Sequence, residues 1–278
     1  MGKILDKATK YILETKDKNP KSVMANAGVS VATAYAAIKE AETALKDARN
    51  SLVVETKPAI VGVIADTHIP FEHPDYLEFC KRTFDRFGVD KVVHIGDLVD
   101  NHAASRFQSE LKAMNVEEEL ELTVKALKPW IEAFPEMNLC LGNHDRIPGR
   151  QAKSVGIPQS FIKTFEELYE LPSTIKCDMT FEIDGVHYDH GLGSGGMYGA
   201  KNTSQKMGQS FVQGHTHMHA GVYYNSDAKG RTYFGMNVGC GIDQSAYAFN
   251  YAAGMRGELT LGCGIVVEGK EGYFIPMK

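Results

Sequence analysis

The sequence predicts an α/β protein: a four-layer α/β/β/α sandwich of two stacked mixed sheets, preceded by a small all-α helix-turn-helix domain. Three observations lead to this prediction. Residues 1–57 show helical periodicity alone, residues 59–170 alternate apolar strand-like runs with helical patterns, and residues from 180 onward form short alternating strands separated by glycine turns. Sheets stacked face to face with helices outside bury the apolar faces of all these elements.

Length, composition and charge agree with two folded modules. The 278 residues suffice for one large and one small domain, and 43% apolar with 23% charged residues exclude global disorder. The net charge of −5 does not indicate a general nucleic-acid coat. Residues 1–57 carry ten Lys and Arg against seven Asp and Glu, so this part is about +3 and the remainder about −8.

The cysteines and the apolar runs predict a cytoplasmic protein. Five cysteines without a CxxC spacing indicate reduced, mostly buried thiols: Cys80, Cys140, Cys177, Cys240 and Cys263. No stretch approaches the ~20 apolar residues of a membrane span, and the N-terminus has no apolar leader. We therefore expect no membrane partner.

Residues 1–50 are expected to form the helical domain. A first helix should end before Asn19-Pro20, a short second helix should close at Gly28 in a left-handed C-cap, and Ser30 should cap a third. The run Ala-Gly-Val-Ser-x-x-Thr-x-Tyr at 27–35 resembles the helix-turn-helix of lactose-repressor and recombinase type proteins. This resemblance implies DNA contacts from the side chains of Ser30, Thr33, Tyr35 and Lys39.

The same helix offers few phosphate contacts, because its first basic residue is Lys39. Phosphate contacts normally dominate nucleic-acid affinity. A helical docking or oligomerisation module therefore stays open as the alternative to DNA binding.

A polar linker at 51–58, broken by Pro58, should separate this domain from a second at 59–278. Its first elements are expected at 59–65 (strand), 75–87 (helix), 92–95 (strand), about 103–128 (helical, interrupted by Pro129), 137–141 (strand) and near 159–170 (helix). Asp184-Gly185 predicts a hairpin between 181–183 and 186–188. Further strands are expected near 210–213, 219–224, 231–235, 259–267 and 272–276.

Metal-binding side chains follow several of these apolar runs. They lie in Asp66-Thr67-His68, Gly96-Asp97, Gly142-Asn143-His144-Asp145, His190-Gly191 and Gly214-His215-Thr216-His217. Ligands of open α/β sheets bind at the carboxyl ends of strands, and one carboxylate can bridge two cations. The sequence therefore predicts a two-metal hydrolytic site centred on Asp97.

These five motifs, spread over about 59–240, resemble those of the calcineurin-like metallophosphoesterases in order and approximate spacing. The resemblance implies a first metal held by Asp66, His68, Asp97 and His217, and a second held by Asp97, Asn143, His190 and His215. His215 and His217, two apart at an expected strand end, should each face one cation. Family habit favours Mn²⁺, and the mixed donor set also suits Fe, Zn²⁺, Co²⁺ or Ni²⁺.

The resemblance also implies roles in catalysis. A hydroxide bridging the metals attacks phosphorus, His144 protonates the leaving group, and Asp145 orients the His144 ring. Asp100 should support the site by hydrogen bonding a ligand histidine.

The chain departs from the family pattern beside this site. Many members place arginine after the second acid, where this chain has Asn101. Substrate binding is therefore assigned only to candidates, which are His102, Arg106 and Arg146. The glycine-rich stretch 191–199 is either a phosphate cradle or a flexible connector.

We therefore expect a dinuclear metal-dependent phosphoesterase acting on phosphate mono- or diesters, with DNA as a candidate partner of residues 1–50. A DNA nuclease or DNA end-processing phosphatase stays open, as does a DNA-binding or assembly protein that uses the fold as a scaffold. The pairing of modules is similar to that of bacteriophage-encoded phosphoesterases, which would place the protein in a bacterial host.

Overall fold

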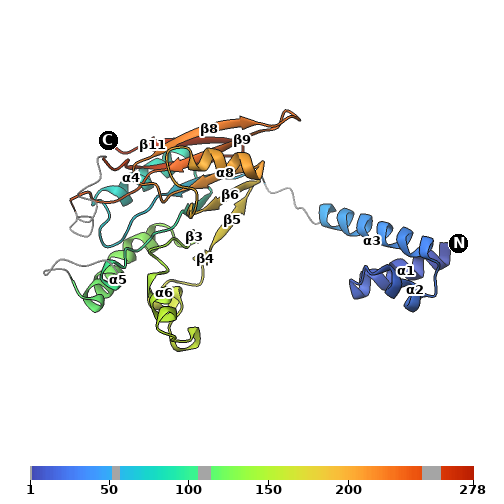
Figure 1. Cartoon of the computed structure of the whole chain (residues 1–278). Coiled ribbons are helices and arrows are strands. Elements are labelled where there is room, and N and C mark those ends of the chain that lie inside the picture. The colour runs from blue at the N-terminus through green and yellow to red at the C-terminus, as the bar shows by residue number, and fades with distance from the viewer. Residues whose placement is uncertain (1, 52–56, 106–113, 246–257) are drawn as a thin grey trace. The chain divides into compact units, whose positions relative to one another are not determined.

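The computed structural model describes residues 2–51, 57–105, 114–245 and 258–278, and the chain divides into two compact units, 1–57 and 58–278 (Figure 1). The first unit contains α1 (Gly2–Thr15), α2 (Pro20–Ala27) and α3 (Val31–Ser51), which confirms the expected all-α start. Buried apolar residues, most of them alanine, form the core between its helices: Ala8, Ile12, Val23, Ala27, Ala34, Ala37 and Ala41. Gly28 ends α2 in the left-handed conformation at φ 67°, with its N–H donating to Met24 O.

The second unit contains two mixed sheets. The first has the strand order β11-β10-β1-β2-β3-β4 and contains β1 (Ile60–Ile64), β2 (Lys91–His94), β3 (Asn138–Cys140), β4 (Lys176–Asp178), β10 (Gly262–Val267) and β11 (Glu271–Pro276). The second has the order β5-β6-β7-β9-β8 and contains β5 (Thr180–Ile183), β6 (Val186–Asp189), β7 (Ser210–Gln213), β8 (Ala220–Ser226) and β9 (Thr232–Val238). Neighbouring strands from β1 to β4 are parallel, as are β6, β7 and β9, so the carboxyl ends of these strands meet at shared edges.

Helices cover both outer faces, as the four-layer prediction requires. On the first sheet lie α4 (Tyr76–Phe87) and α5 (Val116–Ala133), where Phe84 contacts Phe134 and Trp130 contacts Tyr76. The helix α8 (Gly199–Met207) lies against β7, β8 and β9 of the second sheet (Figure 1). Between the sheets, side chains such as Val63, Val212, Met236 and Val238 join one buried core.

Two predicted helices differ from the structure. Helix α5 continues through Pro129 to Ala133, so the expected interruption is wrong; apolar contacts such as those of Trp130 hold the last turn in place. The expected helix near 159–170 is instead η2 (Gln159–Phe161) followed by α7 (Phe165–Leu168). Thr164 divides them because it is extended and forms a capping box with Glu167.

Further elements lie outside the sequence prediction. They are β4, α6 (Ile147–Ser154), α8 and the short η1 (His102–Ala104). Part of the predicted helix at 103–128 falls on 106–113, outside the described residues. The five cysteines are free thiols, and all except Cys177 are buried. Among the residues that the structure describes, no helix has the length and hydrophobicity that crossing a membrane requires.

Candidate metal centre

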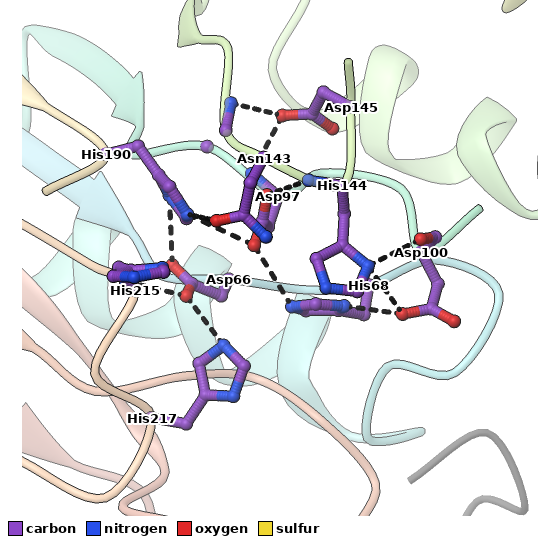
Figure 2. Close-up of polar contacts among 12 residues, drawn as sticks. Asp66, His68, Asp97, Asp100, Asn143, His144, Asp145, His190, His215 and His217 are labelled. Carbon is purple, nitrogen blue, oxygen red and sulfur yellow. Dashed lines mark hydrogen bonds and ion pairs between the residues drawn. The ribbon is translucent and has the colours of Figure 1, made fainter. Parts of the chain in front are cut away.

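The carboxyl ends of five strands bring the predicted donors together. Asp66, Asp97 and Asn143 follow the parallel neighbours β1, β2 and β3, whereas His190 and His215 follow β6 and β7 of the second sheet. Figure 2 shows these side chains pointing toward a common centre, together with His68 and His217. The site therefore lies where the two sheets meet.

The donors form two groups that share one carboxylate. Ligand atoms of Asp66, His68, Asp97 and His217 lie within 4.8 Å of one another, and so do those of Asp97, His190 and His215. Asp97 Oδ2 lies 3.1 Å from His190 Nε2 and 3.6 Å from His68 Nε2. Asn143 Oδ1, on the side of the second group, lies 3.1 Å from His190 Nε2.

The environment of Asp66 fits a bound cation. Its side chain is fully buried, Oδ2 accepts a hydrogen bond from His215 N, and Oδ1 has no hydrogen-bond partner in the described part of the chain. His217 Nε2 lies 2.9 Å from Asp66 Oδ2 but lacks hydrogen-bond geometry toward it. Leaving a buried polar atom unsatisfied costs about 1–3 kcal/mol, which a divalent cation between these atoms would offset. The mixed nitrogen and oxygen donors suit a divalent transition-metal ion.

Left-handed backbone conformations aim several of these side chains. His68 has φ 50°, Asp97 φ 50° and His215 φ 65°, and Asn101 nearby has φ 54°. Non-glycine residues adopt this conformation at a cost, and such residues cluster at functional sites.

Two glycines leave room for the carboxylates. A Cβ on Gly142 would lie 2.1 Å from Asp97 Oδ1, and a Cβ on Gly214 would lie 2.1 Å from Asp66 Oδ1. Both distances are far below van der Waals contact, so any side chain at either glycine would displace a candidate ligand.

His144 lies at the edge of the first group. Its ring centroid is 4.4 Å from that of His68 in an edge-on arrangement, and its side chain is 17% exposed. Its Nδ1 donates to Asp100 O at 2.6 Å and lies 3.3 Å from Asp100 Oδ1. The Nε2 edge of the ring therefore remains for an external group.

Asp100 holds both histidines of this edge. It is fully buried, and its Oδ1 accepts a hydrogen bond from His68 Nδ1 at 2.7 Å. Burial would raise the pKa of Asp100, but the hydrogen bonds from His144 and His68 lower it to about 2. Burial would likewise lower the pKa of His144, but the hydrogen bond to Asp100 and the charge of Asp97 raise it to about 9.

Asp145 does not orient the His144 ring, which corrects the expectation from the sequence. Its carboxylate instead accepts hydrogen bonds from the backbone N–H groups of Asp97, Val99 and Gly142, at 2.8, 3.1 and 2.8 Å. Burial and the neighbouring charge of Asp97 raise the pKa of Asp145 to about 7. Asp145 therefore ties the turn after β2 to the turn after β3. The contact with the His144 ring that was expected of Asp145 is made by Asp100.

The second group is organised by opposite charges. Burial would lower the pKa of His190, but Asp97 raises it to about 10, with a further contribution from Asp66. Burial would raise the pKa of Asp97, but the charge and hydrogen bond of His190 lower it well below its usual range. The Nδ1 of His190 donates to Ile95 O at 3.1 Å, so Nε2 is the nitrogen that faces the centre.

The arrangement of His215 and His217 has a different origin from the one expected. Strand β7 ends at Gln213, and residues 214–219 form a turn in which Thr216 N donates to Gly214 O. The two rings belong to different groups because of this turn and the positive φ of His215, not because of strand alternation.

The three substrate-binding candidates lie in different environments. The His102 side chain is buried, and its backbone N–H donates to Glu119 Oε1. Arg106 lies outside the described residues. Arg146 precedes α6 and lines a pocket beside Asp145.

Sequence reasoning missed Asn101, which positions the turn that carries His144. Its Nδ2 donates to His144 O at 3.0 Å, and its Oδ1 accepts a hydrogen bond from Tyr169 Oη at 2.6 Å. The only available signal was the residue type, because asparagine tolerates the left-handed backbone better than most residues.

The glycine-rich stretch after His190 is anchored from behind. Gln213 Nε2 donates to Ser194 O at 2.8 Å, and Asn237 Nδ2 donates to Met197 O at 3.0 Å.

In the helical unit, Ser30 Oγ accepts a hydrogen bond from Thr33 N and caps α3. Tyr35 and Lys39, one turn apart, are both exposed.

Comparisons with known proteins address the second unit. The family model described as "Calcineurin-like phosphoesterase" matches residues 60–236. Similar solved structures include Vacuolar Protein Sorting 29 from Cryptosporidium parvum, with 10% identity, a TM-score of 0.42 and coverage of 79% of this chain and 92% of that one. They also include a metallophosphoesterase from Sphaerobacter thermophilus, with 14% identity, a TM-score of 0.40 and coverage of 79% of this chain and 88% of that one. A third is the nuclease MPE of Pseudomonas putida, with 11% identity, a TM-score of 0.31 and coverage of 77% of this chain and 87% of that one. No curated protein matches the chain.

Proposed function

The chain belongs to the calcineurin-like phosphoesterase family, and we propose that residues 58–278 hydrolyse phosphate mono- or diesters with two divalent cations. The family typically binds divalent metals. One observation carries the proposal: the Asp97 carboxylate belongs to both donor groups, so it is placed to be shared by two cations. The cations would supply Lewis-acid stabilisation and activation of water.

The residues have distinct proposed roles. Asp66, His68 and His217 hold one cation with Asp97, and Asn143, His190 and His215 hold the other with it. His144 donates a proton to the leaving oxygen through Nε2, and Asp100 keeps that ring protonated and oriented. General-acid catalysis of this kind contributes typically 10²–10⁴-fold in rate.

Metal-dependent turnover of p-nitrophenyl phosphate and its bis ester, with Mn²⁺ as the first ion, tests this proposal. Asp97→Ala should lose bound metal and turnover together. His144→Ala should retain both metals and lose about 10²-fold or more in kcat. His187→Ala, on β6 outside both donor groups, is the matched control and should behave like the parent.

A parent protein that hydrolyses no ester with any of Mn²⁺, Fe²⁺, Zn²⁺, Co²⁺ or Ni²⁺ would contradict the proposal. It would favour the alternative in which the fold is an assembly scaffold. A metal-free His144→Ala variant would contradict the role of His144 alone.

We further propose that the helical unit targets the enzyme to DNA. Support comes from the left-handed turn at Gly28, the capping of α3 by Ser30, and the exposure of Tyr35 and Lys39 on one face. In a gel shift with duplex DNA, the full-length Tyr35→Ala/Lys39→Ala variant should bind more weakly than the parent. Unchanged DNA binding together with a changed oligomeric state would instead support a docking module.

A further inference from the structure

The segment between His144 and α7 has an unusual charge. Residues 146–163 include four basic residues, Arg146, Arg150, Lys153 and Lys163, and no Asp or Glu, in a chain whose net charge is −5. The segment contains α6 and η2 and projects from the body of the second unit (Figure 1). The charge of this segment is therefore opposite to that of the rest of the unit.

The four cations line one pocket. It has a volume of about 380 Å³, and its apolar wall includes Ile162 and Phe165. Within the part of the chain that the structure describes, none of the four forms an ion pair with a carboxylate. Four unneutralised cations around one hollow make a site for an anion with several charges.

Large apolar side chains are exposed on the same segment. Phe161 is 80% exposed and Val155 is 72% exposed. Phe161 is not part of the pocket wall, but it directly precedes the wall residue Ile162. Proteins bind single strands without sequence preference by stacking bases on exposed aromatic rings while cations meet the phosphates.

The pocket adjoins the proposed reaction centre. Asp145 forms part of its wall and hydrogen bonds to the backbone N–H of Asp97, while Arg146 is two residues from His144. An anionic chain seated in the pocket would therefore run beside the metal centre.

We propose that residues 146–163 form a binding surface for single-stranded nucleic acid, which makes a polynucleotide phosphodiester the substrate of the centre. This assignment rests on the proposed function and adds the substrate class to it. Charge complementarity favours a polyanion, and the exposed ring favours one with bases.

The test uses the full-length protein and a fluorescein-labelled 20-nucleotide oligothymidylate, with binding followed by anisotropy in EDTA over a range of salt. The variant Arg150→Gln/Lys153→Gln/Lys163→Gln should bind at least about tenfold more weakly than the parent. The slope of log K against log salt should fall by about 2, at roughly 0.7 per lost phosphate contact. Phe161→Ala, which removes an exposed ring, should weaken binding by a further few-fold.

The matched control removes the same charge elsewhere in the unit. Lys125→Gln/Lys176→Gln/Lys229→Gln changes three exposed lysines outside the pocket and should bind within about twofold of the parent. Both triple variants should keep the Mn²⁺-dependent turnover of bis-p-nitrophenyl phosphate, since this small diester needs no strand-binding surface.

Equal loss of binding in the two triple variants, or none in either, would overturn the proposal. The proposal would also be overturned if the Arg150→Gln/Lys153→Gln/Lys163→Gln variant lost binding to phosphatidylserine vesicles but bound the oligonucleotide like the parent. The partner of the segment would then be a membrane. A parent that binds the oligonucleotide through this segment but hydrolyses no ester would overturn the proposed function and leave the surface standing. A parent that hydrolyses the small diester but does not bind the oligonucleotide would overturn the binding surface and leave the proposed function standing.

Discussion

Replacing Asp100 by asparagine should remove the proton from His144 over much of the alkaline range. The Asp100 carboxylate lies 3.3 Å from His144 Nδ1, and the Asp100 backbone carbonyl lies 2.6 Å from the same nitrogen. The substitution keeps the backbone contact and the side-chain size, so it removes mainly the negative charge. We therefore expect the pKa of His144 to fall.

The structure sets the size of this effect. The pKa of His144 is raised from 6.5 to about 9 against the opposing effect of burial, a difference of about 3 kcal/mol at 1.36 kcal/mol for each pKa unit. The charge of Asp97 remains in the variant and supplies part of the increase in the pKa of His144. The pKa of His144 should therefore fall by roughly one to two units. At pH 8, protonated His144 should fall from about 90% to half or less.

The assay is a ¹³C-edited NMR titration of the His144 ring in the metal-free protein, assigned with His144→Gln. In the Mn²⁺-loaded enzyme the alkaline limb of kcat should move to lower pH by a similar amount, because the general acid loses its proton earlier. Asp227→Asn, at the β8–β9 turn, removes a remote carboxylate and should leave the ring pKa unchanged. An unchanged pKa in Asp100→Asn, or a lowered pKa with an unmoved alkaline limb, would refute the reasoning.

Three more outcomes are expected. Gly142→Ala places a methyl group 2.1 Å from the Asp97 carboxylate, so bound Mn²⁺ measured by mass spectrometry should fall severalfold or more. Metal binding at pH 7 should release about one proton, because His190, with its pKa raised to about 10, must lose its Nε2 proton to coordinate. The affinity for the metal should therefore weaken as pH falls. Calorimetry in buffers of different ionisation enthalpy measures the number of protons released. Tyr76→Phe leaves a buried N–H and C=O without their partner, so the free energy of unfolding should fall by about 1–3 kcal/mol in urea titrations.

Controls separate each effect from general damage. Gly149 has open space around it, so Gly149→Ala should keep full metal binding. Heats of binding that do not depend on the buffer would contradict the protonation state of His190. Tyr273 is exposed, so Tyr273→Phe should change stability by less than about 0.5 kcal/mol. A similar loss in both tyrosine variants would contradict the assigned role of the buried hydroxyl.

The parts of the fold that sequence predicts best are those where local pattern and tertiary environment agree. The run at 59–65 is apolar because β1 is covered on both faces, and the ligand motif that follows it lies at the strand end. The hairpin at Asp184-Gly185 follows from two residues that both adopt positive φ. Turn chemistry of this kind is encoded in a few neighbouring residues.

Errors arose where distant contacts outweighed local preference. Pro129 lacks an N–H and normally ends a helix, yet the packing of the turn around Trp130 holds α5 together beyond it. The helix α8 has a weak apolar pattern and is fixed by its contacts with β7, β8 and β9. Neither contact can be read from a local window of sequence.

The same distinction applies to the candidate site. Residue types and strand ends predicted which side chains meet, because parallel strands carry their carboxyl ends to one edge. They did not predict which carboxylate contacts His144. Asp100 and Asp145 are the same residue type and both lie in turns, so residue type does not distinguish them. The backbone directions that decide this, including positive φ at Asp97 and Asn101, depend on tertiary hydrogen bonds.

Charge balance explains how the chain can assemble this centre before any cation binds. Asp66, Asp97 and Asp100 are buried and carry lowered pKa values, which would be costly without neighbouring positive charge. His144 and His190, with raised pKa values, supply that charge as imidazolium groups. Asn143 adds an oxygen donor without a further negative charge. A cation bound by the second group would replace the proton of His190, whereas His144 lies outside both donor groups and would not have to give up its proton to coordinate a cation.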